Sequence, residues 1–364
     1  MNFTRFGRPA VIAVVAALAL TSCAANEGAA PETDSDTASG LTGTINAGGS
    51  SAQGSAQEAW IAAFQTSNPD LTINYDPSGS GAGREAFIAG GSDFAGSDSY
   101  LNDEELAGTF GSCAAGTTAI DLPNYISPIA VIFNVEGVDE LNVDADTLAK
   151  IFAGTVTTWN DPALVALNEG VTLPSTPITA VHRSDDSGTT KNFADYLGQN
   201  APTVWTEKAS DTFPFQSGEG AQGTSGVVDA VTNGTGTIGY ADASRAGDLG
   251  VAKLKVGDEF VAYSAEAAAA VVDGSPLVEG REANDLAFDL NRMTTNPAEY
   301  PLVLVSYAIV CTEYADADQA ELVKAYVGYM TSAEGQAEAE ASAGAAPMTT
   351  ALQDKVAAVL ETIK

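Results

Sequence analysis

The chain has 364 residues and carries 48 Asp and Glu against 15 Lys and Arg, so its formal net charge is −33 at pH 7. Hydrophobic residues make up 45% of it, enough for a sizeable core in one large domain or two, which excludes a disordered acidic polymer. So negative a chain, with no cluster of Lys and Arg, also argues against a nucleic-acid partner, because its surface repels a phosphate backbone.

The first forty residues predict export and attachment to the cell membrane. Residues 1–22 have the pattern of a signal peptide, with Arg5 and Arg8 ahead of an apolar stretch too short to span a bilayer. The stretch ends in Leu20, two small residues and Cys23, which resembles a bacterial lipobox, where the signal is cut before the cysteine and the cysteine is lipidated, for example with palmitate. An ordinary cleaved signal with an incidental cysteine is the alternative. Residues 23–40 are then expected to form a flexible acidic tether.

Beyond the tether, extended apolar segments alternate with small-residue loops and amphipathic helices. The expected strands are 41–47, 71–75, 126–133, 177–181 and 302–310, and the expected helices are 57–65, 84–89 and 190–197. Strands that alternate with helices predict an α/β fold built on parallel sheets. We expect the two most apolar strands, 126–133 and 302–310, to cross between two lobes, with residues 41–125 plus 307–364 in lobe I and 126–306 in lobe II.

Two cysteines, Cys113 and Cys311, remain after Cys23 is assigned to a lipid. An exported protein resides where disulfides persist, so we predict that these two cysteines form a disulfide. The alternative is two buried thiols, because the sequence does not place the two Cα atoms within bonding reach.

The motifs argue against an enzyme. His182 is the one histidine, so a Ser-His-Asp or Cys-His site would have to be built on it. The sequence contains no G-x-S-x-G, no G-x-x-x-x-G-K and no H-E-x-x-H, and it has too few His and Cys residues for a metal site of that type. Pairs of carboxylates are plentiful, but chance alone produces them in so acidic a chain.

Three small-residue loops, each between an expected strand and an expected helix, favour anion binding. They are Gly49–Ser51, Gly79–Gly81 and Ser187–Thr189. A helix start offers unpaired N–H groups and partial positive charge, Gly allows close approach of a ligand, and Ser or Thr adds a hydroxyl donor. Arg183 precedes the third loop, and its fork can hold two anion oxygens if Asp185 or Asp186 orients it. The alternative is that these are ordinary turns and that Arg183 is an exposed arginine in a charged loop.

Asp98, at the end of Asp93–Asp98, is an unexpected residue beside an anion. It becomes useful if the ligand still carries a proton, because its carboxylate accepts a hydrogen bond from the P–OH of phosphate. Fully ionised sulfate has no such proton and meets only repulsion, so Asp98 would select against it. The alternative is that Asp98 caps a helix ahead of Asp103–Glu105.

Several segments resemble those of the substrate-binding lipoproteins of bacterial high-affinity phosphate ABC transporters, the Pst-type phosphate-binding proteins. The matching segments are Ala47–Ser51, Gly79–Gly83, Asp93–Asp98, Thr157–Pro162, Arg183 with Asp185–Thr189, and Gly236–Tyr240. Their order and spacing agree with the family from about residue 44 to 240. The resemblance implies an α/β, two-lobed, type II periplasmic-binding-protein fold with the ligand in the cleft between the lobes.

The resemblance also implies a set of phosphate ligands. Carried across position by position, the set is Ser51, Ala52 (through its backbone), Ser80, Asp98, Arg183, Ser187, Gly188 and Thr189. The first loop departs from the family, which often has Thr-Phe-Pro where this chain has Ser51, Ala52 and Gln53. Ser51 keeps the hydroxyl and Ala52 keeps the N–H, but Gln53 replaces a rigid proline, so the resemblance is weakest at this loop.

The sequence therefore predicts a protein that binds inorganic phosphate outside the cytoplasm, with a lipid anchor in the cell membrane, and delivers it to the membrane permease of an ABC transporter. A monomer without cofactor, metal or nucleic acid is expected, and no enzymatic activity. Two alternatives are a binding protein for another oxyanion or an organic phosphate, and a secreted phosphoester hydrolase that uses Ser51 or Ser187.

Overall fold

The computed structural model describes residues 40–364. The predicted signal peptide, the lipidated Cys23 and all but the last residue of the tether lie outside the described residues. Within residues 40–364, no helix combines the length and the apolar character needed to cross a bilayer.

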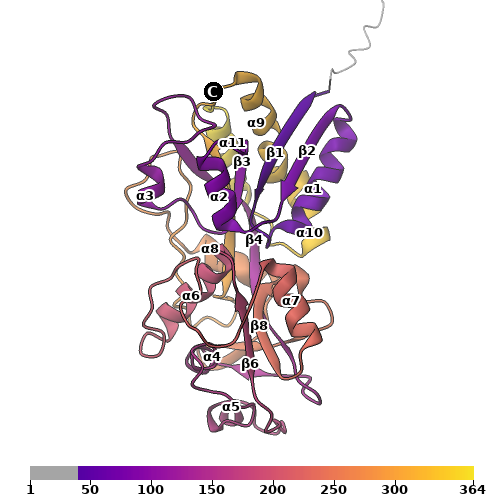
Figure 1. Cartoon of the computed structure of the whole chain (residues 1–364), viewed down its shortest axis with the longest axis vertical. Coiled ribbons are helices and arrows are strands. Elements are labelled where there is room, and N and C mark those ends of the chain that lie inside the picture. The colour runs from indigo at the N-terminus through magenta and orange to yellow at the C-terminus, as the bar shows by residue number, and fades with distance from the viewer. Residues whose placement is uncertain (1–39) are drawn as a thin grey trace, which may run out of the picture. The chain divides into compact units, whose positions relative to one another are not determined.

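One group of elements comes from the two ends of the described chain and lies in the upper part of Figure 1. Its N-terminal members are β1 (Gly43–Gly49), α1 (Gly54–Ser67), β2 (Leu71–Asp76), α2 (Ser80–Ile88), β3 (Phe94–Ser97) and α3 (Asp103–Leu106). Its C-terminal members are α9 (Ala317–Thr331), α10 (Ala333–Ala343) and α11 (Thr350–Leu360). The Trp60 indole of α1 donates to the Gly335 carbonyl of α10 at 2.6 Å, so the two ends of the chain pack as one unit.

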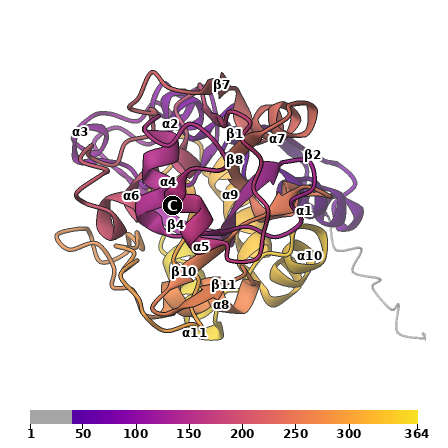
Figure 2. The same cartoon turned by 90° about the horizontal axis from the view of Figure 1, so that it is seen from below.

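The second group lies between the long strands β4 (Ala119–Asn134) and β12 (Val303–Cys311) in the sequence. It contains β5 (Asn142–Val143), α4 (Ala145–Phe152), α5 (Pro162–Leu167), β6 (Thr179–Arg183), α6 (Gly188–Asn200), β7 (Glu219–Ala221), α7 (Gly223–Asn233), β8 (Thr237–Asp242), η1 (Ala243–Arg245), β9 (Gly250–Val251), β10 (Lys253–Val256), β11 (Glu259–Val261) and α8 (Ala265–Asp273). Figure 1 shows α4, β6 and α5 in the lower part of the molecule, away from β1 and β2, and in the view from below in Figure 2 α4 and α5 lie toward the viewer.

A single sheet joins the two groups, and its strands follow the order β2-β1-β3-β12-β4-β8-β6-β7, with β9 also on β4. The strand β4 pairs with β12 from Ala119 to Pro128 and with β8 from Ile129 to Asn134. Its residues are buried up to Phe133, as expected of a strand covered on both faces. The predicted strands 126–133 and 302–310 correspond to β4 and, from Val303, to β12. Both pair antiparallel with their neighbours, so the expectation of parallel sheets holds for β1, β2 and β3 and for β6, β7 and β8 but is wrong for these two strands, and the lobe boundaries stay a prediction.

The predicted helices begin earlier than their apolar periodicity suggests. The helix predicted from Arg84 begins at Ser80, directly after Gly79, and the helix predicted from Thr190 begins at Gly188. Gly79 adopts φ +112° as the N-cap of α2, a conformation that favours glycine. The small residues of the second and third predicted loops therefore form the first turns of α2 and α6, where N–H groups lack partners inside the helix, while the first loop ends before α1.

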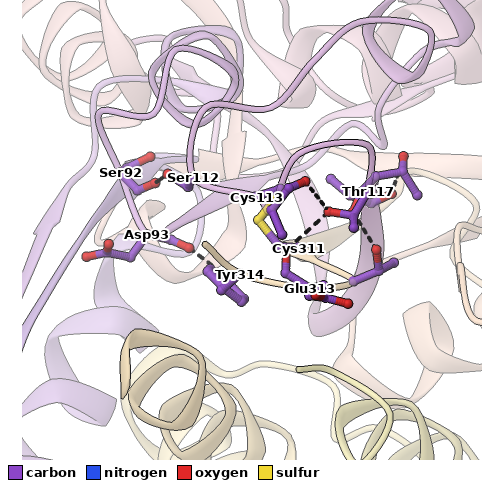
Figure 3. The surroundings of a disulfide bond; sticks show 12 residues. Ser92, Asp93, Ser112, Cys113, Thr117, Cys311, Glu313 and Tyr314 are labelled. Atoms are coloured by element: carbon purple, nitrogen blue, oxygen red, sulfur yellow. Dashed lines mark hydrogen bonds between the residues drawn. A yellow bond between two sulfur atoms is a disulfide. The ribbon is translucent and has the colours of Figure 1, made fainter. Parts of the chain in front are cut away.

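The predicted disulfide between Cys113 and Cys311 is confirmed (Figure 3). It joins the segment after α3 to the last residue of β12, across 198 residues of sequence. Hydrogen bonds reinforce the junction, with Ser112 Oγ donating to the Ser92 carbonyl at 2.8 Å and the Tyr314 hydroxyl to the Asp93 carbonyl at 2.9 Å. The disulfide therefore fixes the end of β12 to the loop that follows α3.

We expect the double substitution Cys113→Ser and Cys311→Ser to lower the free energy of unfolding by about 2–5 kcal/mol, because it frees a long loop in the unfolded chain. Urea unfolding of the oxidised protein and the variant measures this difference, and the oxidised protein treated with a reductant should match the variant. Equal unfolding midpoints for the oxidised protein and the variant would contradict the prediction.

Candidate anion-binding site

The three small-residue loops meet at one edge of the sheet, where β1, β2 and β3 have their carboxyl ends. The Gly79 N–H donates to the Gly49 carbonyl at 2.7 Å, which joins the first two loops. The Gly81 N–H donates to the Asp186 carbonyl at 3.0 Å, which joins the second loop to the third. Parallel strands bring their carboxyl ends together at such an edge, the usual place for a ligand in α/β folds.

Asp98, directly after β3, is the centre of this meeting point and is only 4% exposed. Its Oδ1 accepts hydrogen bonds from Ser50 Oγ at 2.5 Å and Ser306 Oγ at 2.6 Å, and its Oδ2 accepts one from Thr189 Oγ1 at 3.0 Å. Its N–H donates to Ser80 Oγ at 3.1 Å. Residues from β12 and α6 and from the loop after β1 thus converge on one carboxyl group, and α2 binds the backbone of the same residue.

Burial raises the pKa of Asp98 above its usual value, while the three hydroxyls and the nearby charge of Arg183 act in the opposite direction. A carboxylate has about four acceptor positions, and the three hydroxyls use three of them. The alternative role for Asp98, a helix cap, is wrong, because Asn102 caps α3 in a capping box with Glu105.

Arg183 ends β6 and is 3% exposed, so it is not an arginine of an exposed loop. Its Nε donates to Asp185 Oδ1 at 2.7 Å and its Nη2 to Asp185 Oδ2 at 2.5 Å, so Asp185 rather than Asp186 orients the fork. Partial burial of Asp185 acts to raise its pKa, but the bonds and charge of Arg183 prevail and lower it. Two of the five guanidinium N–H donors are used in this pair.

The N-terminus of α6 completes this side of the site. Ser187 is the N-cap, and its Oγ accepts a hydrogen bond from the Thr190 N–H at 3.2 Å. A Cβ added to Gly188 would lie 2.7 Å from backbone and side-chain atoms of Asp98, so glycine is needed for this close approach. The Thr190 hydroxyl lies 2.7 Å from the Tyr240 hydroxyl, which also accepts the Arg183 N–H at 3.2 Å.

The first loop differs from the expected arrangement. Ser51 lies beside the start of α7, where its Oγ is 3.0 Å from Thr224 Oγ1 and accepts the Thr224 N–H at 3.0 Å. The neighbouring Ser50, rather than Ser51, bonds Asp98, and its Oγ also accepts the Ala52 N–H at 3.1 Å. Gln53 is fully buried and accepts a hydrogen bond from the Asn124 amide at 3.1 Å.

Two groups of predicted residues therefore form. Ser80, Gly188 and Thr189 surround Asp98. Ser51 and Arg183 lie instead near the turn into α7. Ser51 accepts the Thr224 N–H, and Asp185, the partner of Arg183, accepts the Gly223 N–H at 2.9 Å. The sequence interpretation missed four residues of this region, which are Ser50, Thr224, Tyr240 and Ser306. Ser50 and Tyr240 lie within the segments Ala47–Ser51 and Gly236–Tyr240 that resemble the family, but Ser306 lies in an apolar strand that gives no sign of a polar role.

His182 does not take part in a catalytic arrangement in the part of the chain that the structure describes. Its ring stacks on Phe213 with centroids 3.9 Å apart, and its Nδ1 lies 2.9 Å from the Arg183 carbonyl oxygen. Its hydrogen bonds there include no serine hydroxyl. Residues 40–364 also contain no group of three His, Cys, Asp or Glu side chains placed to hold a metal ion.

The chain is similar in sequence to known proteins. A PBP superfamily domain matches residues 31–334. Phosphate-binding protein PstS 2 of Mycobacterium tuberculosis is 36% identical over 100% of both chains, and phosphate-binding protein PstS 3 of Mycobacterium leprae is 40% identical over 78% of each chain. The chain belongs to the PstS family within the PBP superfamily. The predicted family is therefore confirmed.

Solved structures establish the fold of this PstS-family protein. A high-affinity periplasmic phosphate-binding protein bound with phosphate (PfluDING) superposes with a TM-score of 0.70 at 23% identity, over 87% of this chain and 93% of that one. A putative phosphate ABC transporter substrate-binding protein from Clostridium perfringens superposes with a TM-score of 0.59 at 19% identity, over 84% and 100% of the two chains. The predicted two-lobed α/β fold is confirmed.

A second buried carboxylate, Asp242, ends β8 in this PstS-family protein. Its Oδ1 accepts the Ser244 N–H at 3.0 Å and the Ser244 hydroxyl at 2.5 Å, and the Tyr125 hydroxyl lies 3.2 Å from both carboxylate oxygens. Burial raises the pKa of Asp242 to about 6, the bonds from Ser244 oppose the shift, and the charge of Asp98 adds to it. Two acidic groups thus share one buried region.

The raised pKa of Asp242 predicts a specific pH dependence of stability. Between about pH 4 and pH 6 the unfolded chain ionises this group while the folded chain keeps it protonated, so the free energy of unfolding falls as the pH rises. We expect Asp242→Asn to reduce that fall by about 2–3 kcal/mol. Urea unfolding from pH 4 to pH 7 measures it, with the exposed Asp229→Asn as control, and parallel curves for Asp242→Asn and wild type would refute the assignment.

Proposed function

We propose that this protein binds inorganic phosphate outside the cytoplasm and delivers it to the membrane permease of an ABC transporter. The observation that carries the proposal is the buried Asp98 carboxylate, which is surrounded by hydroxyl donors and lies near the charge of Arg183. PstS-family relatives named phosphate-binding proteins, at 36% to 40% identity, support the same ligand. A site of this kind suits an anion that retains a proton.

The phosphate ligands that we propose are Ser51, Ala52, Ser80, Asp98, Arg183, Ser187, Gly188 and Thr189. The donors among them are hydroxyls, main-chain N–H groups of Ala52 before α1 and at the starts of α2 and α6, and one guanidinium. Helix N-termini add partial positive charge, and a fixed guanidinium binds two anion oxygens at once. Such donors stabilise a dehydrated anion without a metal or a cofactor, which this proposal does not require.

Selectivity for phosphate follows from the remaining acceptor position of Asp98. Hydroxyls of Ser50, Thr189 and Ser306 hold the carboxylate in place, and the P–OH of phosphate supplies a fourth donor. Sulfate lacks this proton, so its oxygen would face the carboxylate with repulsion and no hydrogen bond. Rejection then comes from an unfavourable contact rather than from a weaker attraction.

The N-terminal segment gives the proposed location. We propose that residues 1–22 are a signal peptide, that Cys23 carries the lipid, and that residues 23–40 tether a monomeric binding domain to the outer face of the cell membrane. Lobe I, residues 41–125 and 307–364, would close against lobe II, residues 126–306, by bending of the strands that join them. The tether keeps the domain near its permease while leaving it free to close.

Isothermal titration tests the proposed function directly. After endogenous ligand has been removed by unfolding, dialysis and refolding, inorganic phosphate should bind the purified protein with one site per chain. Sulfate at the same concentrations should release no binding heat and should not compete. An absence of phosphate binding by a refolded protein with native circular dichroism would overturn the proposal, and a phosphatase assay on the same sample checks the hydrolase alternative.

Replacing Asp98 tests the basis of selectivity. We expect Asp98→Asn to weaken phosphate binding by about 10- to 100-fold, since it removes a charge-assisted hydrogen bond to the P–OH group. Sulfate should bind this variant measurably better than it binds wild type, because the repulsive charge is gone.

The matched control for this variant is Asp93→Asn, which makes the same change in the same segment. Asp93 accepts the Asn46 N–H at 2.7 Å and does not belong to the proposed ligand set. Unchanged rejection of sulfate by Asp98→Asn, measured by competition calorimetry, would show that the carboxylate is not the selective element.

A further inference from the structure

A buried ion pair outside the proposed ligand set joins the two groups of elements. Arg84 in α2 donates from Nη2 to Asp211 Oδ2 at 2.6 Å, and Asp211 lies in the segment between α6 and β7. Ser99, which follows β3, donates from Oγ to Asp211 Oδ1 at 2.5 Å. The side chains of Arg84 and Asp211 are 7% and 14% exposed, so this contact is largely shielded from solvent.

Arg84 is held in position by its own side of the molecule. Its Nε donates to Glu105 Oε1 at 2.9 Å and its Nη1 to Ser97 Oγ at 3.1 Å. The guanidinium is planar and rigid, so these two bonds fix the direction of the third, which reaches Asp211. The N-terminal group therefore presents a preoriented donor to the segment that follows α6.

Asp211 in turn is tied to the start of α6. Its carbonyl oxygen accepts the N–H of Ser187, the N-cap of α6, at 2.9 Å. The neighbouring Thr212 donates from Oγ1 to Asp186 Oδ1 at 2.7 Å. The position of Asp211 is thus coupled through hydrogen bonds to the start of α6, which supplies Ser187, Gly188 and Thr189 to the proposed site.

We propose that Arg84 and Asp211 form a latch that holds the two lobes closed over bound phosphate. The inference rests on the proposed function. Both residues act without touching the ligand, so they are positioning residues: they lower the free energy of the closed state and thereby slow release. A contact that exists only in the closed state increases the population of that state, and the apparent affinity for the ligand rises with that population.

The surrounding charges make the latch reversible. When the lobes separate, Arg84 keeps Glu105 as its partner, while Asp211 keeps the positive charge of Lys191 nearby. Neither ion is left uncompensated, which avoids the large cost of an unpaired buried charge. Burial alone would raise the pKa of Asp211, but the charges of Arg84 and Lys191 lower it, so Asp211 stays ionised at neutral pH.

The latch is tested by the release of radiolabelled phosphate, chased with unlabelled phosphate, from wild type and from Asp211→Asn, Arg84→Gln and the double variant. Each single variant should release phosphate about tenfold faster, and the double variant no faster than either, because the two side chains act as one unit.

The matched control is Asp195→Asn. It breaks another Arg–Asp pair, from Arg292 Nε to Asp195 Oδ2 at 2.7 Å, which lies within the second group of elements. This variant should lose stability to urea yet release phosphate within about twofold of the wild-type rate. If Asp211→Asn does not fold, Arg84→Gln and the conservative Arg84→Lys carry the test, and Arg84→Lys should release phosphate at an intermediate rate.

Wild-type release rates in both Asp211→Asn and Arg84→Gln, with phosphate still bound by wild type, would overturn the latch and leave the proposed function standing. Equal acceleration in Asp195→Asn would also overturn it, because general destabilisation would then explain the effect. If wild type binds no phosphate, the proposed function and the latch fail together.

Discussion

The structure of this site depends on one buried carboxylate. A carboxyl group withdrawn from water is costly unless its oxygens are hydrogen-bonded, and the donors that satisfy Asp98 come from three separate parts of the chain. Ser50 follows β1, Thr189 begins α6 and Ser306 lies within β12. The hydrogen bonds to Asp98 hold each of these hydroxyls in place. Asp98, which we propose as the residue that selects the ligand, therefore also positions β12, the start of α6 and the loop after β1 relative to one another.

The strongly acidic composition and an anionic ligand are compatible because most of the arginines lie inside the protein, while the lysines of residues 40–364 are partly or fully exposed. Four of the five arginines in residues 40–364 have side chains no more than 8% exposed, and they are Arg84, Arg183, Arg281 and Arg292. Inside a protein, charges are screened far less than at the surface, where ions act over about 8–10 Å at physiological salt. The net charge of the chain therefore governs how its outer surface interacts with other molecules. The few groups that surround a bound ion decide whether a cation or an anion binds there.

Local pattern predicted much of the fold and only part of the site. Alternating strands and helices, the two long apolar strands and the Cys113–Cys311 pair all follow from features that the sequence carries directly. The hydroxyl neighbours of Asp98 do not, because a serine in an apolar strand such as Ser306 gives no periodic signal, and a one-residue shift decides whether Ser50 or Ser51 faces the carboxylate. Asp211, in a segment without regular structure, takes its role entirely from tertiary contacts.

Selection and retention of the ligand use different residues in the proposed mechanism, but both act through the first turn of α6. Thr189 in this turn bonds Asp98, which selects for a protonated oxyanion, and Ser187 bonds Asp211, which belongs to the latch. An anion that satisfies the donors of this turn also favours the position of α6 in which the Arg84–Asp211 pair forms. Because coupling is reciprocal, the same pair keeps the turn in place for the ligand. One short helical segment therefore links recognition of phosphate to closure around it.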